Sequence, residues 1–142
     1  TYAASLGKPV LVYQGLGGGH RHDNDRHHRF ILDGAREVAA ALAARGLRHV
    51  FHLPRDPRAR SPLHDLVVHA CVLVCEDFPA PPFPRWTERW AARCTAATMA
   101  VDATCIVPMN LAQRGYDRAY AFRDALIEAF EARVDATWPD AP

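Results

Sequence analysis

The sequence predicts an α/β domain, built as a three-layer, Rossmann-like parallel sheet with helices on both faces. Short runs rich in valine and aromatic residues alternate along the chain with longer segments of helical periodicity. Strands that alternate with helices in this way form parallel sheets with right-handed crossovers. At 142 residues the chain is long enough for one domain with its own core. In such sheets the ligand site lies beyond the carboxyl ends of the strands.

The strands are predicted from length and composition, and they are residues 9–13, 48–53, 70–77 and 98–103. A long helix is expected between the first two, because Gly46 stands at the position of a C-cap and apolar residues recur before it at helical spacing, namely Ile31, Ala35, Val38 and Leu42.

Three further helices are predicted. Ser61 and Pro62 are typical first residues of a short helix that runs to His69. Residues 84–94 have the pattern of another helix. The last helix, within residues 115–134, places its large apolar side chains near one face, and these are Tyr120, Leu126, Ile127 and Phe130.

The start of the chain is unusual for this class of fold. Residues 1–7 read as the last turns of a helix that ends at Gly7, and the first strand follows at once. A doubly wound domain normally opens with a strand before its first helix, so we expect the first strand of the sheet to be missing here. Its neighbours would then lack a partner, and either a longer reading frame or another segment or chain would fill the gap.

The overall charge points to no particular partner. Seventeen basic and sixteen acidic residues give a net charge of +1, so any nucleic acid or acidic ligand would have to be recognised by a local patch. No apolar run approaches the roughly 20 residues that span a bilayer, and the N-terminus lacks the pattern of a secretory signal. We therefore expect a cytoplasmic protein without a membrane partner.

The four cysteines have no CxxC spacing, and two of them lie inside an apolar strand-like run. We interpret Cys71, Cys75, Cys94 and Cys105 as small buried apolar residues; disulfides or zinc ligands are the alternative.

The glycines and histidines that follow the first strand form the first candidate site. The sequence GLGGG, residues 15–19, suggests a phosphate loop, but a dinucleotide fingerprint must open a helix directly, and HRHDNDRH intervenes. The histidines and aspartates of this loop are the right types for a transition metal, but a glycine-rich loop preorganises ligands poorly. A surface loop without a functional metal site is favoured over a metal-dependent enzyme that uses His20 and His22. Asn24 or Asp25 is expected to cap the next helix.

The stretch EDFPAPPFPRW after the third strand is the second candidate site, because two carboxylates and two aromatic residues directly follow a buried strand. Glu76 and Asp77 could hydrogen-bond a ligand at this edge while Phe78 stacks on it. The alternative is a proline-stiffened turn whose aspartate caps the next helix. No GxSxG elbow is present and no cysteine has an obvious histidine partner, so no catalytic residue is predicted.

Five motifs in order resemble the N-terminal α/β domain of the DNA photolyase and cryptochrome family. They are DRHHRFILDGAREVAAAL, RHVFHLPRDP, VLVCEDF, PRWTERWAARC and VDATCIVPMNLAQRGYDRAYAFRDAL. The class II cyclobutane pyrimidine dimer photolyases are the most similar, with FMLEGLREV where this chain has FILDGAREV. The resemblance covers nearly the whole chain.

The resemblance implies a function for an intact protein. Such a protein uses blue light and reduced FAD, held in a helical domain that is not among these residues, to split pyrimidine dimers in ultraviolet-damaged DNA. Residues 1–133 would be the α/β domain and residues 134–142 the start of a linker, so this chain alone is not expected to be catalytic.

The resemblance also implies an antenna chromophore, a deazaflavin or a folate, at the ends of the strands. The loops concerned are QGLGGGH and CEDFP, and the implied cofactor-binding residues are Gly15, Leu16, Asp77 and Phe78. Relatives have a stretch resembling LDPEF where this chain has its glycines, and Gly17 to Gly19 offer no apolar wall to a flat chromophore. The alternative function is a stand-alone module that binds a nucleotide or flavin.

Overall fold

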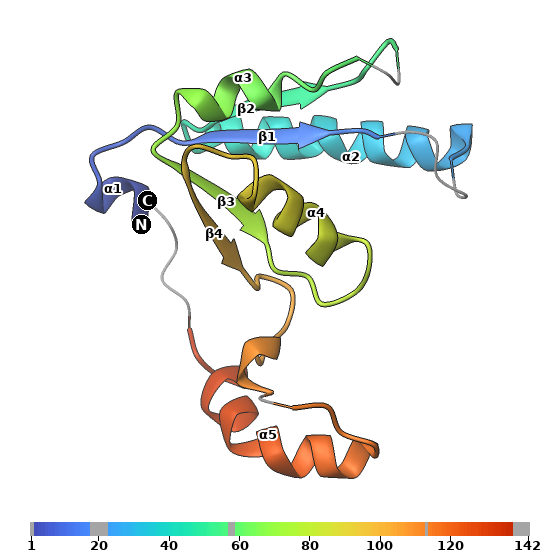
Figure 1. The fold of residues 1–142 in the computed structure, drawn as a ribbon, viewed down its shortest axis with the longest axis vertical. Coiled ribbons are helices and arrows are strands. Elements are labelled where there is room, and N and C mark those ends of the chain that lie inside the picture. Colours follow the sequence, from blue (N-terminus) through green and yellow to red (C-terminus); the bar gives the residue numbers. More distant parts are fainter. Residues whose placement is uncertain (1, 18–22, 57–58, 113, 138–142) are drawn as a thin grey trace. The chain divides into compact units, whose positions relative to one another are not determined.

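The computed structural model describes residues 2–17, 23–56, 59–112 and 114–137 (Figure 1). Helices and strands alternate along the chain, and the chain divides into two compact units, the first within residues 1–64 and the second within residues 65–139. Each unit contains one pair of parallel strands. The α/β class and the parallel pairing are therefore confirmed, with the four strands divided between two sheets.

The first unit is built on β1 (Leu11–Gly15) and β2 (Arg48–His52), which pair in parallel with Gly15 opposite His52. The crossover between them is α2 (Asp25–Ala44), which packs against β2. Gly46 ends this crossover with φ at 71°, a left-handed conformation that glycine adopts without strain. Before β1, the short helix α1 (Tyr2–Ser5) leads into a turn at Gly7, as the sequence predicted.

The N-terminus of α2 corrects one expectation about the histidine loop. The side-chain oxygen of Asn24 accepts a hydrogen bond from the backbone N–H of His27 at 3.0 Å, which confirms the predicted cap. The helix therefore begins at Asp25, within the stretch HRHDNDRH that was expected to precede it, and His27 and His28 lie in its first turn. Nε2 of His28 lies 2.6 Å from Oδ1 of Asp23. His20, His22 and Gly18 to Gly19 lie outside the described residues.

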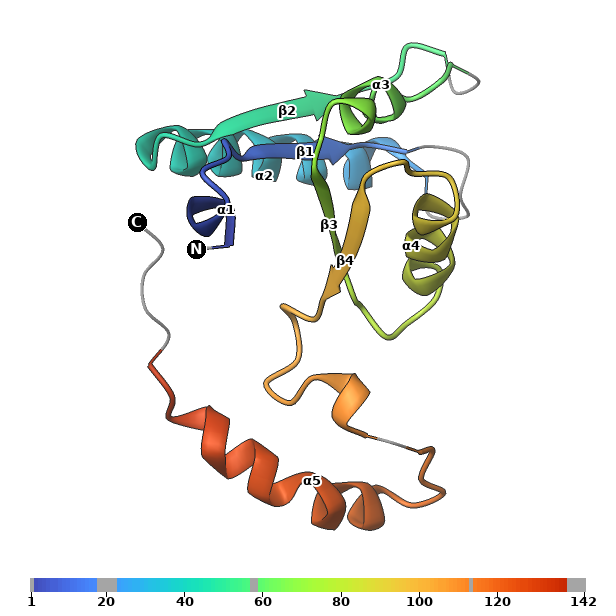
Figure 2. The ribbon, with the colours of Figure 1, turned by 60° about the vertical axis from the view of Figure 1, so that its left-hand side comes forward.

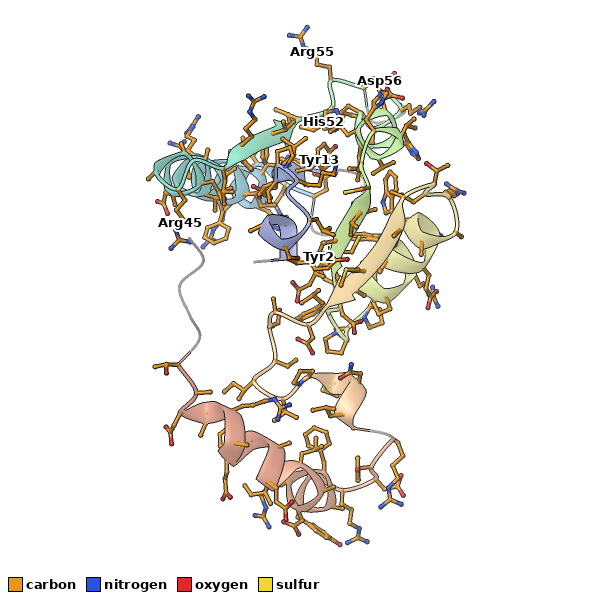
Figure 3. The ribbon with its side chains drawn as sticks, turned by 90° about the vertical axis from the view of Figure 1, so that its left-hand side faces the viewer. Tyr2, Tyr13, Arg45, His52, Arg55 and Asp56 are labelled. Carbon is orange, nitrogen blue, oxygen red and sulfur yellow. The ribbon has the colours of Figure 1, made fainter. Side chains whose placement is uncertain are left out.

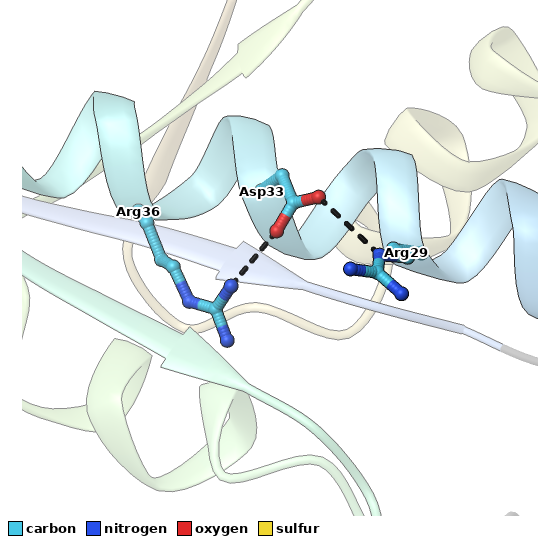
Figure 4. Close-up of polar contacts among 3 residues, drawn as sticks. All are labelled: Arg29, Asp33 and Arg36. Atoms are coloured by element: carbon cyan, nitrogen blue, oxygen red, sulfur yellow. Dashed lines mark hydrogen bonds and ion pairs between the residues drawn. The ribbon is translucent and has the colours of Figure 1, made fainter.

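The outer face of α2 carries a small network of charges (Figure 4). Asp33 lies 2.8 Å from Nη1 of Arg36 and 3.9 Å from Nε of Arg29, one turn away on either side. All three side chains are at least half exposed. Exposed ion pairs of this kind contribute little to stability and mark a solvated helix face.

The second unit is built on β3 (Val72–Glu76) and β4 (Ala97–Val101), with Glu76 opposite Val101. The helix α4 (Phe83–Ala91) connects them and packs against both strands, as Figure 2 shows. The short helix α3 (Leu63–Val68) precedes β3, and its first N–H is accepted by the Ser61 hydroxyl at 3.3 Å, as predicted. The 3-10 turn η1 (Met109–Leu111) and α5 (Ala119–Val134) follow β4.

The buried apolar core among the described residues is small, and it comprises Leu16, Ala35, Val67 and Leu126. In α5, Leu126 is 7% exposed, but Tyr120, Ile127 and Phe130 are 55%, 38% and 39% exposed. Of the four apolar residues predicted to lie near one face of this helix, only Leu126 is therefore buried.

All four cysteines are free thiols, but Cys71 is exposed, so its interpretation as a buried residue is wrong; the other three are half-buried. Among the described helices, none combines the length and the apolar character that crossing a bilayer requires.

Candidate functional site

The candidate site of the second unit lies at the carboxyl ends of β3 and β4. The backbone N–H of Asp77 donates to the carbonyl of Val101 at 2.9 Å, which extends the parallel ladder by one residue beyond β3. The side chain of Asp77 is half-buried. Its carboxylate has no hydrogen bond or ion pair to any residue that the structure describes, so it is available as an acceptor for a ligand.

Glu76, the neighbouring acid, accepts hydrogen bonds from other residues of the chain. Its Oε1 accepts hydrogen bonds from the backbone N–H of Ala103 at 3.2 Å and from the hydroxyl of Thr104 at 2.9 Å. Its backbone carbonyl accepts the hydroxyl of Thr87 in α4 at 3.3 Å. Glu76 therefore ties the end of β3 to the loop after β4 through one of its carboxylate oxygens, whereas neither oxygen of Asp77 has a partner among the described residues.

A third carboxylate, Asp102, organises the loop after β4. Its Oδ1 accepts from the backbone N–H groups of Thr104 at 3.1 Å and Cys105 at 2.9 Å, and its Oδ2 accepts from that of Met109 at 3.1 Å. The hydrogen bond from Cys105, with those from Met109 and Thr104, holds the pKa of Asp102 below its ordinary value against the opposing effect of desolvation. Asp102 was not among the residues predicted from the sequence, although an aspartate followed by small and polar residues is typical of such a turn.

The cysteines near this loop are poor nucleophiles. Desolvation raises the pKa of the Cys105 thiol, and the adjacent carboxylates of Asp102 and Glu76 raise it further. Desolvation also raises the pKa of Cys75, with a smaller effect from Cys94. Because the thiolate is the reactive form, these thiols are held in their unreactive state.

Aromatic side chains extend from the end of β3 into the start of α4. The rings of Phe78 and Phe83 meet edge to face at 5.1 Å between centroids, and those of Phe83 and Trp86 at 5.4 Å. Phe83 and Trp86 are 40% and 51% exposed. This aromatic series, Phe78, Phe83 and Trp86, offers flat apolar surface to a ligand. From the sequence, only Phe78 was predicted to stack on a ligand.

The other two predicted cofactor-binding residues belong to the first unit. A Cβ atom on Gly15 would lie 3.3 Å from both Cε1 and Oη of Tyr13, so the glycine leaves room for that side chain. Leu16 is 6% exposed, and its backbone N–H donates to the carbonyl of His52 at 3.0 Å. Gly15 therefore presents only backbone, and Leu16 anchors the strand end in the core.

A shallow cavity of about 350 Å³ lies between η1 and the start of α5. The guanidinium of Arg114 lies 5.1 Å from the centre of the Tyr116 ring, and that ring meets Phe122 edge to face at 5.6 Å. None of the cofactor-binding residues predicted from the sequence lines this cavity. No group of histidine, cysteine or acidic side chains within the described ranges is arranged to hold a metal ion.

No family model matches this chain. It is 29% identical over 110 residues to a deoxyribodipyrimidine photo-lyase of Methanothermobacter thermautotrophicus. The match covers 78% of this chain and 24% of the relative, so the chain spans about a quarter of that protein's length. The fold and this similarity together identify the chain as similar to part of a photolyase.

Proposed function

We propose that this chain is the N-terminal α/β part of a photolyase of the class II type. The observation that carries the proposal is the 29% identity to a deoxyribodipyrimidine photo-lyase over 78% of the chain. The order of strands and helices agrees with the motifs on which the resemblance was based. The intact protein would use blue light and reduced FAD to split cyclobutane pyrimidine dimers in DNA. Its FAD and DNA would be bound by a helical domain outside these 142 residues.

Within that protein, this part would hold an antenna chromophore, a deazaflavin or a folate. Asp77 would accept a hydrogen bond from a donor on the ring system, because its carboxylate is half-buried and unused by the described residues. The aromatic series Phe78, Phe83 and Trp86 would supply an apolar wall. The loop after β4 is held by Glu76 and Asp102, so the edge at which the ring would bind is preorganised.

Gly15 and Leu16, the other two predicted cofactor-binding residues, carry less of this proposal than Asp77. The resemblance implies a cofactor-binding role for both, but they belong to the first unit, where Gly15 presents only backbone and Leu16 holds the end of β1 in the core. Neither would contribute a polar side chain. Asp77 is therefore the residue whose replacement tests the proposal most directly.

The chromophore proposal is tested by titrating the chain with a deazaflavin and, separately, with a folate, and by following the ligand's fluorescence anisotropy. Asp77→Asn should weaken binding roughly tenfold, since a hydrogen bond to a charged group contributes about 1.5–3 kcal/mol. Asp117→Asn, a change at an exposed acid of the same unit, is the matched control and should leave binding unchanged. Equal affinity in the wild-type chain and Asp77→Asn would contradict the role of Asp77.

The photolyase proposal is tested on the protein isolated from its own cells. An absorption spectrum with flavin bands, and loss of pyrimidine dimers from irradiated DNA under blue light, are the expected results. No loss of dimers under blue light would favour the second candidate, a stand-alone nucleotide- or flavin-binding module. That candidate predicts that ATP or FAD raises the melting temperature of this chain, because ligands that bind only the native state stabilise it.

A further inference from the structure

Three side chains of the first unit form a hydrogen-bonded series that the proposed function does not use. The hydroxyl of Tyr13 lies 2.9 Å from Nδ1 of His52 and 2.9 Å from Oγ of Ser61. Tyr13 belongs to β1, His52 ends β2, and Ser61 precedes α3, so folding brings together residues far apart in sequence. All three are half-buried. Figure 3 shows Tyr13 and His52 side by side.

The direction of the hydrogen bonds follows from counting donors and acceptors. The backbone N–H of Leu63 donates to Ser61 Oγ at 3.3 Å. If the Ser61 hydroxyl then donates to Tyr13, and the Tyr13 hydroxyl donates to Nδ1 of His52, every hydroxyl hydrogen has an acceptor. In the reverse direction, the Ser61 hydroxyl hydrogen has no acceptor within the series. Half-buried polar groups are most stable when all are paired, so the first arrangement is favoured.

This arrangement determines the tautomer of His52. An Nδ1 that accepts from Tyr13 carries no hydrogen, so the neutral ring carries its hydrogen on Nε2. No described residue accepts a hydrogen bond from that Nε2. The ring therefore offers one donor of defined position, at the residue where β2 ends.

We propose that His52, oriented by Tyr13 and Ser61, is a ligand-binding residue that donates its Nε2 hydrogen to an oxyanion, the phosphate or carboxylate of a small molecule. The carboxyl end of a parallel strand is where ligands bind in sheets of this class. The loop that follows β2 carries two arginines, Arg55 and Arg60, against one acid, Asp56, among its described residues, a balance of charge that favours an anion. Figure 3 shows Arg55 projecting outward from this loop. Tyr13 and Ser61 are positioning residues in this proposal.

The tautomer is tested by long-range ¹H–¹⁵N NMR spectra of the labelled chain at mildly alkaline pH. His52→Asn identifies the His52 signals by their loss. The expected result is the Nε2–H form in the wild-type chain and a mixture of tautomers in Tyr13→Phe. An Nδ1–H form or an even mixture in the wild-type chain would overturn the series.

Binding is tested by titrating the same chain with inorganic phosphate and, in a second arm, with acetate, at constant ionic strength. His52→Asn keeps an acceptor at the position of Nδ1 but lacks the Nε2 donor, and it should raise the dissociation constant roughly tenfold. His52→Gln places an amide donor near the position of Nε2 and should restore part of the affinity. His69→Gln, at an exposed histidine, is the control and should change nothing.

The two arms separate the possible ligands, since the tighter of the two probes identifies phosphate or carboxylate as the preferred group. The proposal fails if the wild-type chain binds neither probe, or if His52→Asn binds both as well as the wild-type chain does. Asp77, a residue of the second unit, is not among the residues that carry this proposal. A failure of chromophore binding at Asp77 would therefore leave this proposal standing.

Discussion

Oδ1 of Asp102 lies 2.9 Å from the backbone nitrogen of Cys105, and the other oxygen of the same carboxylate accepts the N–H of Met109 at 3.1 Å. One side chain thus holds both ends of the loop that follows β4. Because Glu76 binds the same loop from the end of β3, the geometry of this strand edge depends on two acids that no ligand needs to touch.

The first prediction concerns pH. The hydrogen bond from Cys105, with those from Met109 and Thr104, lowers the pKa of Asp102 in the folded chain below its value in the unfolded chain. The unfolded chain therefore binds the proton more readily, and the stability that Asp102 contributes is fully present above its unfolded pKa. This contribution is lost as the pH falls through the lower, folded pKa.

The measurement is the free energy of unfolding by urea, from neutral pH down to about pH 2, for the wild-type chain and Asp102→Asn. Asparagine retains an acceptor for Thr104 and Cys105 but cannot accept the N–H of Met109 with its amide nitrogen. Asp102→Asn should be less stable at neutral pH, and the difference should shrink in acid. A difference that stays constant with pH would contradict the assignment.

The second prediction concerns Glu76. Glu76→Ala removes the acceptor of two hydrogen bonds and should destabilise the chain by about 1 kcal/mol. Glu76→Gln keeps a carbonyl oxygen in the same place and should cost less than half as much. Amide exchange at Ala103 and Thr104 should accelerate in Glu76→Ala more than in Glu76→Gln. If both variants behave alike, the carboxylate does not hold the loop through these bonds.

A third prediction follows from the space beside Gly15. In Gly15→Ala the new methyl group would lie 3.3 Å from two atoms of Tyr13, tighter than ordinary contact, so the tyrosine must shift. Overpacking of this kind costs about 1 kcal/mol or more, and the shift should also weaken the bond from Tyr13 to His52.

The matched control for that change is Gly17→Ala, because a Cβ on Gly17 meets nothing within 4 Å. Thermal unfolding of both variants, with the tautomer spectrum of His52, distinguishes crowding from a general loss of backbone freedom. Equal melting temperatures in the two variants would refute the crowding of Tyr13.

The fourth prediction concerns the edge of β1 that does not face β2. The N–H of Leu16 donates to the carbonyl of His52, so it faces β2. The backbone N–H groups of successive residues in a strand point to opposite edges of that strand. The N–H of Gln14 therefore also points to β2, and the N–H groups of Tyr13 and Gly15 point to the other edge. Hydrogen exchange should therefore be markedly faster at Tyr13 and Gly15 than at Gln14 and Leu16. Similar protection at all four amides would mean that a further segment pairs with this edge.

Local features could be predicted from the sequence because their causes lie within a few residues. Asn24 caps α2 through an N–H three residues away, Gly46 ends the same crossover because it tolerates positive φ, and Ser61 caps α3. Valine-rich runs predicted all four strands to within a few residues. The position of Asp77 immediately after a strand could also be predicted from the sequence. It marks a candidate site because ligands bind beyond the carboxyl ends of parallel strands.

Only the tertiary structure decided which polar groups are occupied and which remain open. Glu76 and Asp77 are neighbours of the same chemical type, yet Glu76 binds Thr104, 28 residues away, while the carboxylate of Asp77 stays open to a ligand. Tyr13 and His52 are 39 residues apart and meet only because β1 and β2 pair in parallel. The sequence by itself determined the elements and their order, since propensity and capping are local. The sites depend on contacts between distant segments, whose partners are set by strand pairing and packing.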